Sequence, residues 1–318
     1  RSGVVGAKSL GSAPKRRVRE WLASGDEDAL FSSSAGQRPS LADIVKMVHP
    51  KPAGPVREAF YAYMVGQSYN ADALPNLVMQ FEQFKAGEAL EVPNLPFMLL
   101  SALPLSQKDW VSIAKNASWQ TTRMNLNTFA RHGVFEADGL ASLIAARLRD
   151  TGEIRRARVF PYQLLTAYQN CDAAVPQEVR DALQDAMELA IANVPSIPGR
   201  VVVCPDVSGS MQSPVTGHRR GSTTAVRCID VAALVTASVL RKNVSATVLP
   251  FEQAVVPVDL NSRDSVMTNA GRLASIGGGG TNCSAPLQML NRRKANADLI
   301  LFVSDNESWV DAGRGRGT

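Results

Sequence analysis

A carboxylate and two hydroxyls, those of Asp206, Ser208 and Ser210, stand at alternate positions directly after the apolar run 201–204. A continuous apolar run of this length is typical of a buried strand in a parallel sheet. Mg²⁺ prefers near-octahedral oxygen ligands and keeps several of its waters, so it needs only a few protein oxygens. The pattern therefore predicts half of a divalent-cation site on the turn that follows a strand.

Oxygen ligands for the other half of the site are available in two later segments. Four glycines at 277–280 let the backbone approach a site closely, and Thr281 follows them. The apolar run 299–303 predicts a second buried strand, with Asp305 just beyond it. Ligands of open α/β sheets bind at the carboxyl ends of strands, so we expect Thr281 and Asp305 to complete the site. The alternative is that the serines and Asp305 only cap helices.

The charge of such a site favours binding over catalysis. Two carboxylates only balance a divalent cation, which leaves the ion open to an anionic oxygen from a partner's carboxylate or an RNA phosphate. His218 is the only histidine in this half, and Glu307 is the one spare acid beside Asp305, so no general base is identified. We therefore expect a protein that is not an enzyme, and a metal-dependent nuclease is the weakest class.

The order of these ligands, D-x-S-x-S, then Thr281, then Asp305, resembles the metal-ion-dependent adhesion site of von Willebrand factor A (vWA) domains. The resemblance implies a doubly wound, Rossmann-like domain over 196–318. It also implies that the serines and the threonine bind the ion directly or through water, with one position left open. Asn282 stands where many relatives carry Asp, which removes a nearby carboxylate.

The composition is that of a globular chain with room for two domains. Its 318 residues are 45% hydrophobic and 20% charged, and the net charge of +5 with a pI near 9.1 is compatible with nucleic acid without being diagnostic. No apolar stretch reaches the roughly 18 residues of a membrane span. Four widely spaced cysteines suggest neither a zinc knuckle nor a redox pair, so we expect reduced thiols and a cytoplasmic location. The chain starts without Met, and we expect it to be a fragment.

Residues 15–193 are predicted to be almost entirely helical. Ser40 and Asp43 form a capping-box pattern at the start of a short helix whose apolar face includes Leu41 and Val45. Short helices separated by Pro- and Gly-marked turns predict stacked, HEAT-like helical pairs. The further predicted helices are 55–66, 74–85, 107–117, 121–132, 137–149, 160–169 and 176–194.

Two basic clusters lie in the first helices. Lys15, Arg16 and Arg17 begin the first one, and Lys46 and His49 are three residues apart, so they share a helix face turned away from the apolar stripe. Phosphate contacts need such a basic face. A solvated face is the alternative for each cluster, and capping of the helix C-terminus is the alternative for His49.

Other chemically capable residues are predicted to be structural. His132, directly before Gly133, is expected to cap a helix, and Trp110 and Trp119 are expected to pack in a core, although a place on a turn stays open for Trp119. Cys204 is expected to be a core residue, as is Cys228.

Four segments resemble the TROVE module of the Ro ribonucleoprotein (Ro autoantigen) family, of bacterial type. They are LADIVKMVHPKP at 41–52, LPFMLL at 95–100, MNLNTFARHG at 124–133 and IRRARVFP at 154–161. In that family a ring of HEAT-like repeats is closed by a vWA domain. The resemblance implies a TROVE-like module over 1–195 and a vWA-like domain over 196–318, both truncated.

Ro-family proteins bind small noncoding Y RNAs on an outer basic surface and 3′ ends of misfolded RNAs in the central hole. The resemblance places His49 on the Y RNA surface and, less directly, Lys15, Arg16 and Arg17. It implies a monomeric RNA-binding scaffold in RNA quality control or decay, with a 3′ exoribonuclease as a further partner and no membrane. The alternative function is a metal-dependent protein-interaction module that binds a partner's carboxylate.

Overall fold

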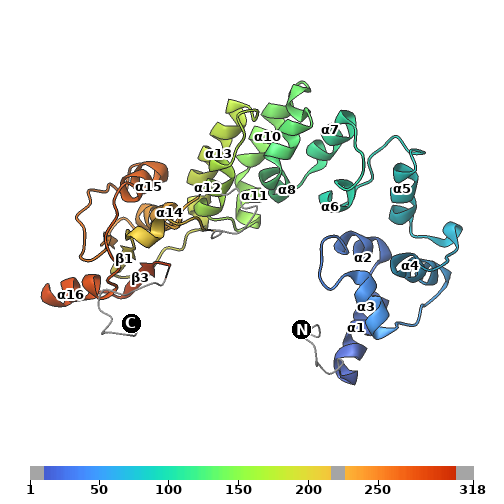
Figure 1. The fold of residues 1–318 in the computed structure, drawn as a ribbon, viewed down its shortest axis with the longest axis horizontal. Coiled ribbons are helices and arrows are strands. Elements are labelled where there is room, and N and C mark those ends of the chain that lie inside the picture. Colours follow the sequence, from blue (N-terminus) through green and yellow to red (C-terminus); the bar gives the residue numbers. More distant parts are fainter. Residues whose placement is uncertain (1–10, 216–225, 306–318) are drawn as a thin grey trace. The chain divides into compact units, whose positions relative to one another are not determined.

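The computed structural model describes residues 11–215 and 226–305, which fall into two compact units divided between Ala117 and Ser118 (Figure 1). In the second unit, α12 of the helical region packs against α14 of the sheet region. The predicted domain division between residues 195 and 196 stays a prediction.

The first unit consists of short helices that pack in pairs. Helix α3 packs on both α1 and α4, and α2 packs on α5. The predicted capping box is present at the start of α3, where the Ser40 hydroxyl accepts from Asp43 N (3.1 Å) and the Asp43 carboxylate accepts from Ser40 N (3.0 Å). The helices are α1 (Ser12–Ser24), α2 (Glu27–Ser33), α3 (Leu41–Val48), α4 (Pro55–Val65), α5 (Asn76–Lys85), α6 (Phe97–Leu100) and α7 (Gln107–Asn116).

The second unit begins with helices of the same kind. Helix α13 packs against α10 and α12, as the stacked pairs require. The single helix predicted over 121–132 is wrong, because Asn125 leaves the helical region at φ −122° and its side-chain amide donates to Thr121 O (2.8 Å). These helices are α8 (Trp119–Met124), α9 (Leu126–Arg131), α10 (Leu140–Leu148), α11 (Thr151–Arg156), α12 (Pro161–Gln169) and α13 (Gln177–Leu189).

Trp110, Trp119 and His132 have the structural roles that the sequence predicts. Trp110 and Trp119 are 4% and 2% exposed, and the Trp119 indole donates to Leu148 O (3.2 Å). His132 is the C-cap of α9, and Gly133 beyond it adopts the left-handed conformation at φ 69°.

A parallel sheet of three strands follows, in the order β2-β1-β3. Central strand β1 is buried along its length: Val202 packs in a cluster with Leu290 of α16, and Val203 packs in another with Val239 of α14. Its continuous apolar run is therefore explained by helices on both faces, and the predicted helical and doubly wound fold class is confirmed. The elements are β1 (Val201–Pro205), α14 (Cys228–Lys242), β2 (Thr247–Val248), α15 (Val266–Ala274), α16 (Ser284–Arg292) and β3 (Leu299–Val303).

Two burial predictions are wrong. Strand β3 was expected to be buried, yet Phe302 is 40% exposed, because β3 pairs only with β1 among the described strands. Cys228 begins α14 and is half-buried instead of lying in the core, whereas Cys204 is fully buried and burial raises the pKa of its thiol to about 12. Each of the four cysteines lies within the described residues, and none of them forms a disulfide bond.

Helices of bilayer-spanning length and apolarity are absent from the described part of the chain.

Candidate metal centre and basic surface

Asp206 is a buried carboxylate at the carboxyl end of β1. Its N–H donates to Val303 O (2.9 Å), so it still belongs to the sheet, and its side chain is 0% exposed. Oδ1 accepts from Ser208 N (2.9 Å) and Oδ2 accepts from the Ser304 hydroxyl (2.7 Å). Within residues 11–215 and 226–305, no cationic side chain forms an ion pair with this carboxylate. A buried negative charge held only by neutral donors fits a bound cation.

Three further hydroxyl groups, those of Ser208, Ser210 and Thr281, contact one another beside this carboxylate. The Thr281 hydroxyl donates to Ser208 Oγ (2.8 Å), and Ser208 and Ser210 Oγ lie 3.2 Å apart. Ser208 precedes a short 3₁₀ helix but makes no side-chain capping bond to it, so capping does not describe its role. We call Asp206, Ser208, Ser210, Thr281 and Ser304 the hydroxyl cluster.

The glycine run brings Thr281 to the cluster by a close backbone approach. Gly209 N donates to Gly279 O (2.9 Å), which ties the two loops together. At Gly277, with φ 147°, a Cβ would lie 2.7 Å from Val207 O. Only glycine satisfies both the conformation and the contact at this position.

Glu252 is an acid beside the glycine loop that the sequence analysis missed. Its carboxylate accepts from Gly279 N (2.8 Å) and its carbonyl accepts from Asn282 N (2.9 Å), so it brackets Thr281 on both sides. The expectation that Glu307 is the only spare acid beside Asp305 stays a prediction. The available signal was the position of Glu252 just after strand β2, at the carboxyl edge of the sheet.

The predicted ligand Asp305 lies one residue beyond Ser304. Burial, and then the charge of Asp305, raise the pKa of the Cys228 thiol, so this carboxylate lies near the start of α14. His218 and Glu307 lie outside the described residues. No group of three His, Cys, Asp or Glu side chains is found in the described ranges, so an ion here depends on hydroxyl oxygens. Such a donor set suits a hard cation such as Mg²⁺.

The predicted basic residues of α1 are at the surface. Arg16 and Arg17 are exposed, and both pair with Glu20, at 3.7 and 3.2 Å. Ion pairs between exposed side chains contribute little free energy and are easily exchanged for another anion. Lys15 is half-buried.

Lys46 on α3 and His49 directly after this helix are both exposed, while Leu41 and Val45 are buried. His49 is also the C-cap of α3: it adopts the left-handed conformation at φ 48° and its N–H donates to Val45 O (2.9 Å). The capping alternative is therefore correct for the backbone of His49, and it leaves the imidazole exposed.

Arg19 joins the two basic helices. Its guanidinium on α1 donates to the carbonyl of Val48 at the end of α3, next to His49. The five predicted residues therefore belong to neighbouring helices of the same unit. We call Lys15, Arg16, Arg17, Lys46 and His49 the basic surface. Only the place of Arg19 in the basic run 15–19 hinted at its role.

Together these features define a class of protein, a HEAT-like helical region followed by a vWA-type sheet with a hydroxyl cluster at its carboxyl edge. Residues 200–314 match the family model of the Ro60 vWA domain. The RNA-binding protein RO60 of Deinococcus radiodurans is 27% identical over 298 residues, covering 85% of this chain and 54% of that protein. The RNA-binding protein RO60 of Caenorhabditis elegans is 24% identical over 177 residues, covering 52% of this chain and 27% of that protein.

The fold agrees with these similarities. The crystal structure of the Deinococcus radiodurans RO (RSR) protein superposes with a TM-score of 0.70 at 20% identity, covering 98% of this chain and 66% of that one. The chain is thus similar to Ro proteins in both sequence and fold, which confirms the resemblance expected from its motifs. The chain spans about half the length of the first of these curated relatives and about a quarter of the second.

Proposed function

We propose that this chain is an RNA-binding scaffold of a Ro-type ribonucleoprotein. The observation that carries the proposal is the basic surface: Arg19 of α1 donates to the Val48 carbonyl next to exposed His49, so the two helices that carry the cations are neighbours. Two relatives that cover half or more of this chain are each named as RNA-binding proteins.

The electrostatics of the basic surface suit phosphate. Lys46 forms no ion pair with any acid in the described part of the chain, and its charge is only the last of the causes that shift the Asp43 pKa, so Lys46 stays available to a phosphate oxygen. Arg16 and Arg17 share a single acid, Glu20, which leaves net positive charge on α1. Each phosphate that a lysine or arginine neutralises releases condensed counterions, so binding weakens as salt increases.

The finer parts of the proposal come from the Ro resemblance. We propose that the RNA is a small noncoding, Y-like RNA, and that single-stranded 3′ ends are a second RNA partner. The chain would act as a monomer in the cytoplasm, without enzymatic activity of its own, and a 3′ exoribonuclease would be recruited through the RNA.

We further propose that the hydroxyl cluster and Asp305 hold Mg²⁺ or another divalent cation. The buried Asp206 carboxylate, which has no cationic partner among the described residues, supports this proposal. Bound there, the ion would attract an anionic oxygen. Asp206, Ser208, Ser210, Thr281 and Asp305 would be the ligands of the ion, and Ser304 would hold Asp206 in place through its hydrogen bond.

The position of the cluster supports a second candidate function, a metal-dependent protein-interaction module. The cluster lies at the carboxyl edge of the sheet, where a partner's Asp or Glu would complete the coordination of the ion. This function predicts partner capture that EDTA abolishes and that Asp206→Asn abolishes as well. Capture that survives both treatments contradicts it.

RNA binding is tested by fluorescence anisotropy of a labelled small structured RNA at several salt concentrations. Lys46→Ala should weaken binding and should reduce the slope of log K against log salt by about one, the value for one lost phosphate contact. Lys108→Ala is the matched control, because Lys108 is exposed in the same unit and lies on α7. Absence of binding at low salt, or an equal loss in the control, contradicts the proposal.

A further inference from the structure

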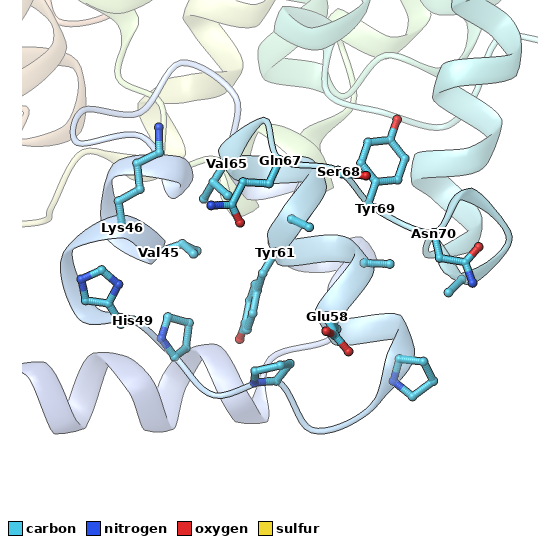
Figure 2. A pocket seen from close by; sticks show the side chains of 16 residues that line it. Val45, Lys46, His49, Glu58, Tyr61, Val65, Gln67, Ser68, Tyr69 and Asn70 are labelled. Atoms are coloured by element: carbon cyan, nitrogen blue, oxygen red, sulfur yellow. The ribbon is translucent and has the colours of Figure 1, made fainter.

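A hollow of about 780 Å³ lies in the first unit, beside the basic surface. One stripe of α3 and one stripe of α4 face each other across it, and the segment 67–70 after α4 completes its wall (Figure 2). A concave site with a few convergent polar groups is the usual form of a small-ligand site. The chemistry of its lining therefore indicates which part of an RNA it would accept.

Tyr69 offers the hollow a fixed aromatic face. The residue is 41% exposed, and its ring packs edge-on against Tyr63, with centroids 5.5 Å apart and planes at 80°. Tyr63 is itself held by a hydrogen bond from its hydroxyl to Glu82 (2.7 Å). The Tyr69 ring is therefore positioned while part of its surface stays free for a base, and a stacked base is worth about 1–3 kcal/mol by alanine substitution.

Tyr61 lies on the floor of the hollow and serves another purpose. It is only 7% exposed, its hydroxyl donates to Leu22 O (3.3 Å), and the Arg57 guanidinium lies over its ring at 5.8 Å. Both its hydrogen bond and its ring contact are thus made within the protein. Tyr61 shapes the hollow, and Tyr69 is the residue that can stack on a ligand.

Glu58 supplies a carboxylate to the same hollow. It lies one turn before Tyr61 on α4 and is exposed, and none of the described residues forms an ion pair or a hydrogen bond with its carboxylate. A carboxylate is an acceptor with two oxygens. Guanine is the one RNA base that presents two neighbouring donors, N1–H and the N2 amine, on its Watson–Crick edge, so it matches Glu58 in a bidentate way.

The charges of the hollow are separated. Figure 2 shows Lys46 and His49 on one side and Tyr69 and Asn70 on the other, with Tyr61 and Glu58 between them. A nucleotide phosphate would be attracted to the cationic side and repelled by Glu58. Its base would consequently lie toward Glu58 and Tyr69.

We propose that this hollow binds one unpaired guanosine nucleotide of the bound RNA. The base stacks on Tyr69 and donates two hydrogen bonds to Glu58, and the phosphate lies against Lys46 and His49. Unpaired bases are the parts of RNA that proteins read by stacking and through their Watson–Crick edges. The inference rests on the RNA-binding function proposed above and adds the base that the basic surface selects.

The test uses the full chain and short labelled oligouridines that carry G, A, C or U at one central position. The wild-type protein should bind the guanosine probe about tenfold more tightly than the others, as one bidentate contact implies. Glu58→Gln should remove this preference and leave affinity for the all-uridine probe within about twofold. Glu88→Gln is the matched control, since Glu88 is exposed in the same unit and lies outside the hollow.

Stacking is tested separately with two variants of Tyr69. Tyr69→Ala should weaken binding of every probe by about tenfold, and Tyr69→Phe should restore it. Binding of the structured RNA without any guanosine preference, or a preference that Glu58→Gln retains, overturns this inference and leaves the RNA-binding function intact. Failure of both the structured RNA and the oligouridines to bind overturns the two together.

Discussion

Replacing Asp206 by asparagine removes one negative charge from the hydroxyl cluster and changes little else. The amide oxygen can still accept from Ser208 N, and the amide nitrogen faces the Ser304 hydroxyl, which can turn to accept. The metal-free variant should therefore lose less than about 1 kcal/mol of stability. Because the removed charge is buried and no cation of the part of the chain that the structure describes pairs with it, its loss offsets part of that cost.

The thermal stability of the wild-type chain should then respond to divalent cations, and that of Asp206→Asn should not. A ligand present at about 100 times its Kd stabilises the folded state by about 2.7 kcal/mol. For a unit of this size, that corresponds to a rise in the unfolding midpoint of roughly 5–10 °C. We expect this rise for the wild-type chain when Mg²⁺ is added after EDTA treatment, and none for Asp206→Asn. The assay is thermal unfolding followed by fluorescence across a Mg²⁺ titration.

Asp138→Asn is the matched control for this experiment, because Asp138 is exposed in the same unit and distant in sequence from the cluster. It should keep the full Mg²⁺ shift. A full shift in Asp206→Asn would refute the assignment of the ion to this carboxylate. A wild-type chain that neither Mg²⁺ nor Mn²⁺ stabilises would refute the metal site itself.

Three further predictions concern stability. Gly277→Ala should cost about 1–3 kcal/mol in urea unfolding, because its Cβ would lie 2.7 Å from Val207 O at φ 147°; an unchanged midpoint contradicts this. Hydrogen bonds from the capping serine's hydroxyl and then its backbone lower the pKa of Asp43, so its stabilisation is present above the ordinary value of 3.8 and is lost as pH falls through the lower folded pKa. Wild type should unfold at a higher temperature than Asp43→Ala at about pH 6, and a gap that does not shrink as the pH is lowered below the ordinary value of 3.8 contradicts the assignment. Trp119→Phe should cost about 1–3 kcal/mol, because it leaves the buried Leu148 carbonyl without its indole donor; calorimetry that finds no loss speaks against this bond.

Local patterns predicted those parts of the fold in which one physical requirement dominates. The run ending at Cys204 is apolar on both faces because helices cover both faces, and Ser40 with Asp43 marks a helix start because their side chains satisfy the first backbone N–H groups. The break at Asn125 was missed because a single side-chain bond to the backbone interrupts an otherwise continuous helical pattern.

Contacts between distant segments were beyond a reading of local pattern. Glu252 and Gly279 are far apart in the chain, and no local rule relates a carboxylate after one strand to an N–H in a later loop. Arg19 donates to the end of α3 because α1 packs against α3, and the residues next to Arg19 in the sequence do not indicate this packing. The sequence singled out Asp206, Ser208, Ser210 and Thr281, whereas it did not indicate Ser304 and Glu252, whose hydrogen bonds hold Asp206 and the glycine loop in place.

RNA recovered by crosslinking in cells that produce this chain tests the central claim most directly. Wild-type protein and a variant with Lys15, Arg16, Arg17 and His49 replaced by alanine are compared after sequencing of the bound RNA. We predict that the wild type recovers a discrete small noncoding RNA and that the variant loses it while keeping the same unfolding midpoint. Recovery of no discrete small RNA by the wild type, or equal recovery by the variant, would contradict RNA binding through the basic surface.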